Sequence, residues 1–153
     1  LPLLTIFFCN SAFAASEIKL TDRLEILEAL SKQNKIQLSQ TKKLTHLCYL
    51  CIKNQVFPVI EVYEIIKGEV TVSRGNSKVI ILDSSLKFLQ EISFNSAEAS
   101  PLYCHQNQLY WGGVTLIDNL LPEGNVFTFK SADKKPDVSY VETNSFPDMK
   151  HLQ

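Results

Sequence analysis

Two cysteines stand three residues apart in Cys48-Tyr49-Leu50-Cys51, a spacing that can close a redox-active disulfide. This chemistry needs a first thiol with a lowered pKa, usually at a helix N-terminus. Here the pair falls in the middle of a predicted element, where a helix dipole has little effect because it acts mainly within the end turns. The pattern therefore favours structural cysteines on an apolar face, one of them bonded to Cys104, and leaves thiol–disulfide exchange as the alternative.

The same cysteines lie near two histidines, and thiolates with imidazoles are typical zinc ligands. The residues that could gather are His46, Cys48, Cys51, Cys104 and His105. Cys104 and His105 are adjacent, however, and neighbouring residues of a strand point to opposite faces, so at most one of them could join a site. An oxidising compartment would also compete for the thiols by forming disulfides. We therefore predict no metal and no cofactor.

Motifs typical of hydrolases and of phosphate-binding loops are absent from the sequence, which has only 5 glycines. The acidic residues Glu61, Glu64 and Glu69 are expected on the solvent side of strands. Glu61 and Glu64 have an odd separation, which places them on opposite faces of a strand. The sequence thus predicts no catalytic residues and favours a protein that is not an enzyme.

An aromatic pair, Tyr110 and Trp111, ends a predicted hairpin and precedes an apolar loop that includes Leu116 and Ile117. Aromatic residues dominate the energetics of many protein interfaces. The loop from 112 to 123 carries more apolar surface than a free loop should expose. These four residues are therefore interface candidates, but for Trp111 we favour core packing, and the loop either docks on the core or meets a partner.

Residues 1–10 form an apolar run that is too short to span a bilayer, and the small-residue site Ala12-Phe13-Ala14 follows it. This pattern is typical of a secretory signal peptide whose basic n-region is missing. We expect cleavage after Ala14, which removes Cys9 and leaves three cysteines for one disulfide and one spare thiol. The mature protein is then expected in the periplasm or outside the cell, without stable insertion in the membrane.

We predict one α+β domain over residues 15–143, after a signal peptide over 1–14 and before a frayed tail over 144–153. Short runs rich in β-branched and aromatic residues, separated by turn residues, predict an antiparallel β-meander of about six to seven strands. The runs are 59–66, 69–74, 78–83, 87–94, 101–105, 108–111, 124–130 and 138–142. Their close succession argues against parallel βαβ units.

One or two helices are expected before the meander, packed on it. Asp22 and Glu25 match a capping box, and Leu24 and Leu30 lie on the apolar stripe of the segment that follows. The segment from 39 to 54 fits the spacing of a helix and also the composition of a strand, and we favour a helix there.

Part of the chain resembles a known repeat unit. The segments 78–92, 101–110 and 124–129 together resemble a single blade of a β-propeller of the bacterial beta-repeat type. These segments lie within residues 78–129, about a third of the chain, and the resemblance implies a small antiparallel sheet in this region. Nothing repeats at a fixed period elsewhere, so a whole propeller is not expected.

The charge of the chain also limits its partners. The 15 basic and 16 acidic residues give a formal net charge of −1, and the densest basic stretches are only pairs. Nucleic acid is therefore not an expected partner, because binding to phosphates needs clustered cations.

Small size, predicted export and the lack of a catalytic set favour a binding or inhibitory protein that acts through a protein–protein surface on another envelope protein. A periplasmic immunity or inhibitor protein is one concrete version of this hypothesis. The alternatives are a thiol–disulfide active protein that uses Cys48 and Cys51, and a structural envelope protein with no discrete site.

Overall fold

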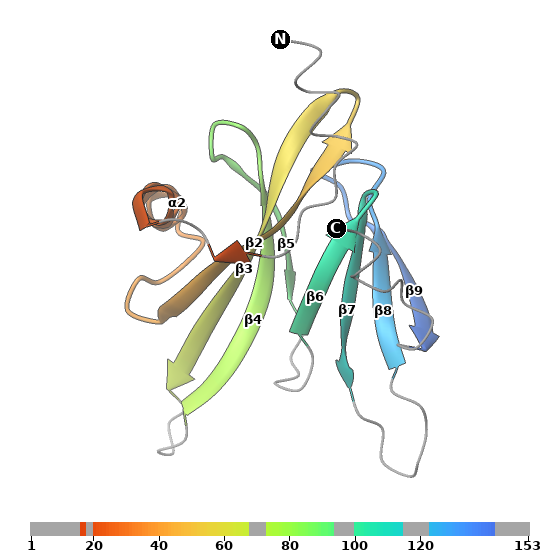
Figure 1. Ribbon diagram of the computed structural model, residues 1–153. Helices are drawn as coiled ribbons and strands as arrows, with labels where there is room; N and C mark the ends of the chain where they lie inside the picture. Colours follow the sequence, from red (N-terminus) through yellow and green to blue (C-terminus); the bar gives the residue numbers. More distant parts are fainter. Residues whose placement is uncertain (1–15, 18–19, 68–72, 94–99, 115–122, 143–153) are drawn as a thin grey trace.

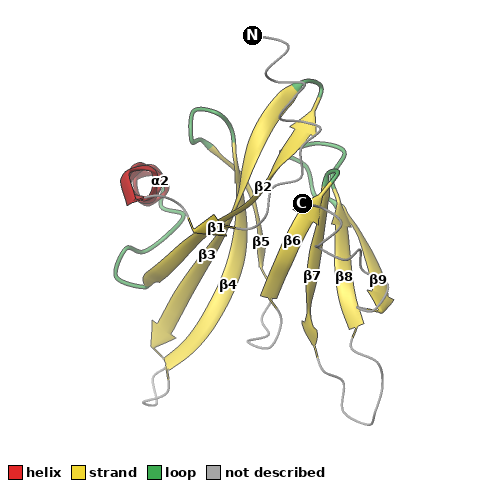
Figure 2. Ribbon diagram, viewed as in Figure 1, coloured by secondary structure: helices red, strands yellow, loops and turns green. Residues whose placement is uncertain are grey.

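The fold consists mainly of β-strands, as Figures 1 and 2 show. The computed structural model describes residues 16–17, 20–67, 73–93, 100–114 and 123–142. In chain order the elements are β1 (Ser16–Glu17), α2 (Leu20–Lys32), β2 (Thr41–Ile52), β3 (Gln55–Lys67), β4 (Ser73–Leu82), β5 (Phe88–Ser93), β6 (Ser100–His105), β7 (Gln108–Val114), β8 (Glu123–Thr128) and β9 (Asp137–Glu142).

The strands form two antiparallel sheets, and within each sheet they follow one another in chain order. The first sheet has the order β1-β2-β3-β4-β5, and the second has the order β6-β7-β8-β9. The prediction of a β-rich α+β protein is confirmed in this broad form, but the prediction of one meander is wrong. Two sheets form because the strands of the first sheet carry apolar residues on both faces, and each face has to be covered.

Residues 41–52 form strand β2, so the helix expected between 39 and 54 is wrong. β2 pairs with β3 over most of its length, and the two strands meet in a tight turn. The turn residues Lys53 and Asn54 have positive φ angles of 52° and 62°. Such a pair of angles matches the two-residue turns whose twist suits an antiparallel hairpin. The turn and the pairing with β3 therefore stabilise a strand here, although the spacing of the apolar residues also fits a helix.

Helix α2 packs against one face of the first sheet, beside β2 to β4 in Figure 1. The helix begins at Leu20, so Asp22 lies in its first turn and not at the expected N-cap position. Leu24, expected on the apolar stripe, is 59% exposed, whereas Ile26 and Leu30 are buried. The buried residues of this helix-side cluster are Ile26, Leu30, Ile36, Leu44, Ile60, Val62, Ile80 and Leu82.

Gln33 fastens the end of α2 to the turn between β4 and β5. Its Nε2 donates to the carbonyls of Ala29 and Leu86, both at 3.0 Å, and its Oε1 accepts the amide of Phe88 at 2.9 Å. The ammonium of Lys35 lies 4.2 Å from the centre of the Phe88 ring, within the range of a cation–π contact. These contacts fix the position of the helix end on the sheet.

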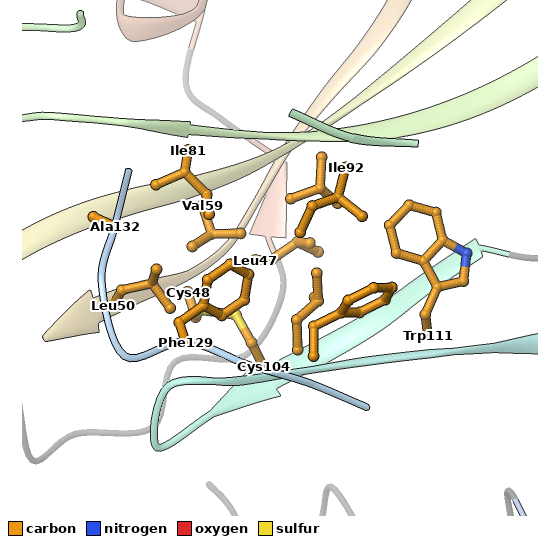
Figure 3. Packing of buried hydrophobic residues seen from close by; sticks show 13 residues of the cluster. Leu47, Cys48, Leu50, Val59, Ile81, Ile92, Cys104, Trp111, Phe129 and Ala132 are labelled. Atoms are coloured by element: carbon orange, nitrogen blue, oxygen red, sulfur yellow. A yellow bond between two sulfur atoms is a disulfide. The ribbon is translucent and has the colours of Figure 1, made fainter. Parts of the chain in front are cut away.

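The opposite face of the first sheet packs against the second sheet, and Figure 3 shows the side chains between them. This inter-sheet core is formed by Leu47, Cys48, Leu50, Val59, Val79, Ile81, Ile92, Cys104, Leu109, Trp111, Phe127, Phe129 and Ala132. Its members come from both sheets and from the segment after β8. The first sheet is therefore the middle layer, with α2 on one face and the second sheet on the other.

Candidate functional site

Cys48 of β2 and Cys104 of β6 form a disulfide that joins the two sheets. Their residues are 5% and 3% exposed, and their Cα atoms lie 5.8 Å apart inside the inter-sheet core (Figure 3). Of the pairings that the sequence left open, this is the one the structure contains. Buried cysteines of this kind are chemically inert, because a reagent cannot reach the sulfur without opening the core. The arrangement fits a structural bond.

A β-bulge brings Cys48 to this position. The register of β2 against β3 shifts between His46 and Cys48, so Leu47 is the extra residue. A bulge lets two consecutive residues oppose one residue of the partner strand and changes the local twist. As a result both Leu47 and Cys48 reach the inter-sheet core. This local irregularity has no signature in the sequence.

Cys51 follows Cys48 by three positions on β2, and a strand directs two such side chains to opposite faces. The backbone of Cys51 is held by Asn107 from the turn between β6 and β7. Asn107 Oδ1 accepts the Cys51 amide and its Nδ2 donates to the Cys51 carbonyl, both at 2.8 Å. None of the cysteines in the described part of the chain is a free thiol, which differs from the spare thiol expected.

The two histidines near the cysteines do not form a site with them. The ring of His46 lies edge-on to that of Tyr49, with 4.4 Å between centroids, and its buried Nε2 has no hydrogen-bond partner. Burial lowers the pKa of His46, and a hydrogen bond with the backbone of Cys48 opposes this shift. His105 lies at the end of β6. Among the residues placed by the structure, no three His, Cys, Asp or Glu side chains are grouped to hold a metal ion.

The aromatic interface candidates lie inside the protein. Trp111 is 1% exposed and its ring lies 6.1 Å from that of Phe127, edge to face. Tyr110 is stacked on Tyr103 at 4.8 Å, and its hydroxyl donates to Gln108 Oε1 at 2.9 Å. Burial raises the pKa of Tyr110. The position of Trp111 agrees with the core packing that the sequence favoured. The other two candidates, Leu116 and Ile117, lie outside the described residues.

An ion cluster lies on the helix side of the first sheet, and two of its three side chains are largely buried whereas that of Glu91 is 36% exposed. Lys78 Nζ is 3.0 Å from Glu64 Oε1 and 3.3 Å from Glu91 Oε1, and it donates to the Lys35 carbonyl at 2.9 Å. The side chains of Glu64 and Lys78 are 9% and 13% exposed. The expectation that Glu64 faces solvent is therefore wrong. In the pairing of β3 with β4, Lys78 lies opposite Val62 and thus diagonally from Glu64, a relation that depends on strand register.

An open polar pocket of about 220 Å³ lies beside this cluster. It is lined by Asn34, Lys35, Ile36, Gln37, Gln40, Glu64 and Lys78. An ammonium group has three donors, and those of Lys78 are matched by two carboxylates and a carbonyl of the protein itself. The ion cluster therefore acts as a fastening between the sheet and the segment after α2.

The last strand of the second sheet presents apolar side chains to solvent. Val138 and Tyr140 are 45% and 75% exposed. β9 pairs with β8 through consecutive residues without a register shift, and Figure 1 places it at the end of the second sheet away from the first sheet. Within the described ranges no strand pairs with its outer side. We call this outer side, at Val138, Ser139 and Tyr140, the β9 edge.

No family model matches the chain, and no curated protein or solved structure is significantly similar to it. In the described segments there is no helix of sufficient length and apolar character to cross a membrane.

Proposed function

We propose that this protein is a small binding module that acts through a protein–protein surface, and that the β9 edge is this surface. The observation that carries the proposal is the exposure of Val138 and Tyr140 on an outer strand, at 45% and 75%. These two side chains lie two residues apart on one strand and so form a contiguous apolar surface, and contiguous exposed apolar surface marks interaction sites.

Contacts with other parts of the protein cover some of the other outer strands in part. The outer side of β2 pairs with β1 at two positions, Ser16↔His46 and Glu17↔Thr45. On β5, Gln90 Nε2 donates to the carbonyls of Ala132 at 2.6 Å and Lys134 at 2.9 Å, so the segment after β8 lies against that strand. β6 is the other end strand of the second sheet, and the disulfide of Cys104 ties it to β2 of the first sheet. β9 differs from β6 in that it presents two large apolar side chains to solvent, Val138 and Tyr140.

The sequence of β9 also suits the addition of a strand. Proteins commonly protect an outer strand with lysine, proline or a bulge, because unpaired backbone groups attract other chains. β9 has no lysine or proline between 137 and 142, and its register against β8 is regular. A partner that adds an extended segment here would gain backbone hydrogen bonds for affinity and contacts with Val138 and Tyr140 for specificity.

The chemistry of the cysteines supports binding over thiol exchange. Cys48 is bonded to Cys104 in the core and not to Cys51, so exchange through Cys48 and Cys51 would require the core to open. A disulfide is typical of proteins in oxidising compartments. This agrees with an exported inhibitor or immunity protein, and we retain that version as the concrete form of the proposal.

Site-specific photocrosslinking tests the proposal. A photoreactive amino acid is placed at Tyr140 or, as a matched control, at Tyr63 of β3, another exposed tyrosine (38%). Each protein is irradiated in a cell-envelope fraction of the source organism. We expect a discrete adduct with a second protein from position 140 only. An excess of wild-type chain should suppress the adduct, and an excess of the Tyr140→Lys variant should not. Equal adducts from both positions, or none from position 140, would contradict the proposal.

A further inference from the structure

The second sheet has a face that points away from the first sheet, and this far face carries a row of buried side chains. In the strand pairings Tyr103 of β6 lies opposite Tyr110 of β7, and Tyr110 lies opposite Val126 of β8. Each of the three is next in sequence to a member of the inter-sheet core, and neighbouring residues of a strand point to opposite faces. Their exposed fractions are nevertheless only 4%, 7% and 8%. We call these three residues the tyrosine row.

Within the described part of the chain, no helix or strand lies over the tyrosine row. The first sheet packs on the opposite face, and α2 lies beyond the first sheet (Figure 1). The connection after β8 also lies on that inner side, because Phe129 and Ala132 belong to the inter-sheet core. An antiparallel sheet that packs on one side commonly has its other face in water. The burial of the row therefore calls for a cover from elsewhere in the same chain.

The burial marks out a strip across three of the four strands. Ser139 of β9 lies opposite Val126 and is exposed, so the strip ends before β9. Gly112 and Gly124 are both buried, and each lies two positions along its strand from a member of the row. A glycine within a strand often marks a place where another backbone approaches closely. The two glycines and the row thus outline a path for a segment that crosses β6, β7 and β8.

We propose that residues 143–153 fold back over this path as a strap that covers the tyrosine row. The frayed tail expected from the sequence, residues 144–153, lies outside the described residues. The chain enters this segment at Glu142, which pairs with Glu123 at the end of the sheet where the two glycines lie. Eleven residues that are free at one end can reach about 36 Å, whereas a sheet of four strands is only about 14 Å wide. The strap is therefore long enough to reach β6.

The internal loop 115–122 is anchored at both ends and cannot take the same path. It leaves and re-enters the sheet at Val114 and Glu123, which are paired with each other. Eight residues that go out and return reach about 13 Å, which is the length of strand from Val114 back to Tyr110. No length then remains for the loop to cross to Tyr103 on β6.

The remaining segments outside the described residues start from the first sheet. Residues 94–99 connect β5 of the first sheet to β6 of the second. Packed sheets lie about 10 Å apart, so this step takes about half of the reach of six residues. Residues 68–72 join β3 to β4, and residues 1–15 and 18–19 flank β1 at the outer side of β2. The C-terminal segment is therefore the one that both starts in the second sheet and has a free end.

The sequence of the strap suits this position. Its apolar residues Phe146, Met149 and Leu152 recur every three positions, with mostly polar residues between them. A spacing of three places side chains on one side of an extended segment of the polyproline type. Methionine also makes favourable contacts with aromatic rings, and Tyr103 and Tyr110 form a stacked pair. One side of the strap can thus face the tyrosine row.

The inference goes beyond the proposed function and does not depend on it. Because Ser139 is exposed, the strap crosses β8 without running back along β9, and the β9 edge stays open. Displacing the strap would uncover the tyrosine row as a second apolar surface. The C-terminal segment therefore controls whether that surface is available.

Methyl NMR of the full chain tests the strap directly. Met149 is the one methionine of the sequence, so methionine labelling gives a single probe, which the Met149→Leu variant identifies. We expect its methyl signal to be shifted upfield by the tyrosine rings, with nuclear Overhauser effects to Tyr103 and Tyr110. Tyr110→Leu should return the signal toward its position in the urea-unfolded chain, whereas Tyr63→Leu, at an exposed tyrosine of β3, should leave it unchanged. A wild-type signal at the unfolded position, without these contacts, would overturn the inference.

Hydroxyl-radical footprinting of the full chain provides a second test. Phe146→Lys combined with Met149→Lys should raise the modification rate of both tyrosines of the row toward that of Tyr140, which is 75% exposed. Asn144→Lys combined with His151→Lys is the charge-matched control and should leave the row protected. Circular dichroism and peptide mapping of the inter-sheet disulfide verify that each variant is folded. Protection that persists in the first variant, or equal modification in both, would overturn the inference. Neither outcome depends on an adduct at position 140, so the proposed function is tested separately.

Discussion

Lys78 shows how a single residue can determine local stability. It neutralises Glu64 in a place where both side chains are largely removed from solvent, at 13% and 9% exposure. Burying a charge is costly, and removing one partner of a buried pair leaves the other uncompensated. The cluster therefore stabilises the contact between the first sheet and the segment after α2.

Replacing Lys78 by methionine should lower the free energy of unfolding by about 1 to 3 kcal/mol, because Glu64 would lose its cation but would still line an open pocket that water can reach. Urea denaturation followed by circular dichroism measures this loss. Lys32→Met is the matched control, since Lys32 pairs with Glu28 on the surface of α2 at 74% and 67% exposure. The control should change stability by less than about 1 kcal/mol. Equal effects of the two substitutions would contradict a special role for Lys78.

His46 should make stability depend on pH. Burial lowers its pKa in the folded protein below the usual value of 6.5, so the folded state binds this proton less readily than the unfolded state. Above about pH 6.5 the neutral imidazole costs the folded state no stability. As pH falls from there toward the folded pKa, the unfolded state binds a proton that the folded state does not, and stability decreases. Wild type should therefore lose stability between about pH 7 and 5 by more than His46→Gln does, as measured by urea denaturation. Parallel pH profiles would contradict this assignment.

At the scale of elements, turns and strand pairing explain why part of the fold could be predicted from the sequence and part could not. Runs rich in Val, Ile and Phe predicted most of β3 and of β5 to β9, because composition and turn residues are local signals. The separate strands predicted at 69–74 and 78–83 are wrong in one respect, because residues 73–82 form the single strand β4. β2 was predicted as a helix, because its apolar spacing also fits a 3.6-residue period and the bulge at Leu47 distorts its alternation. Local patterns cannot reveal pairing with distant strands.

The candidate sites could also be predicted only in part, because they depend on how distant strands pair and stack. The cysteine count predicted a disulfide, but the choice of Cys104 for Cys48 depends on how two sheets stack. The burial of Glu64 depends on the register of β3 and β4. The exposure of Tyr140 could not be foreseen either, because a strand pattern does not tell which strand will be outermost.

Asn107 connects two hairpins, and its removal should loosen them. Asn107 has a φ of 62° and its side chain makes both hydrogen bonds with the backbone of Cys51. Asn107→Gly keeps the positive φ accessible and leaves two polar backbone groups without their partner, so we expect a loss of about 1 to 3 kcal/mol. Asn54→Gly is the control, because Asn54 has the same φ of 62° in the exposed β2–β3 turn. Urea denaturation should show little change for the control, and equal losses would contradict the prediction.

At the scale of the whole molecule, the disulfide links segments that are far apart in the chain. Cys48 and Cys104 are separated by 56 residues. A bond across a loop of this length restricts the unfolded chain and should contribute about 4 kcal/mol. The double variant with Cys48→Ala and Cys104→Ala should lose a comparable amount in urea denaturation. A loss below about 1 kcal/mol would mean that the inter-sheet core holds the sheets together without the bond.

The links between the sheets are concentrated at one end of the molecule. The disulfide joins Cys48 of β2 to Cys104 of β6, and three residues further along each chain Cys51 is hydrogen-bonded to Asn107 in the turn after β6. In Figure 1 the sheets lie close together at this end and diverge toward the far ends of β3 and β4.

Because both links lie at this end, we expect the two sheets to separate first at the opposite end. Thermal opening should pivot at the two turns, so that the amide of Cys51 exchanges hydrogen with deuterated water more slowly than amides near Ile65, at the far end of β3. Hydrogen exchange resolved by residue would reveal this gradient. The pairing of β9 with β8 involves neither of these links, so β9 could separate from β8 while the two sheets stay joined at the turns.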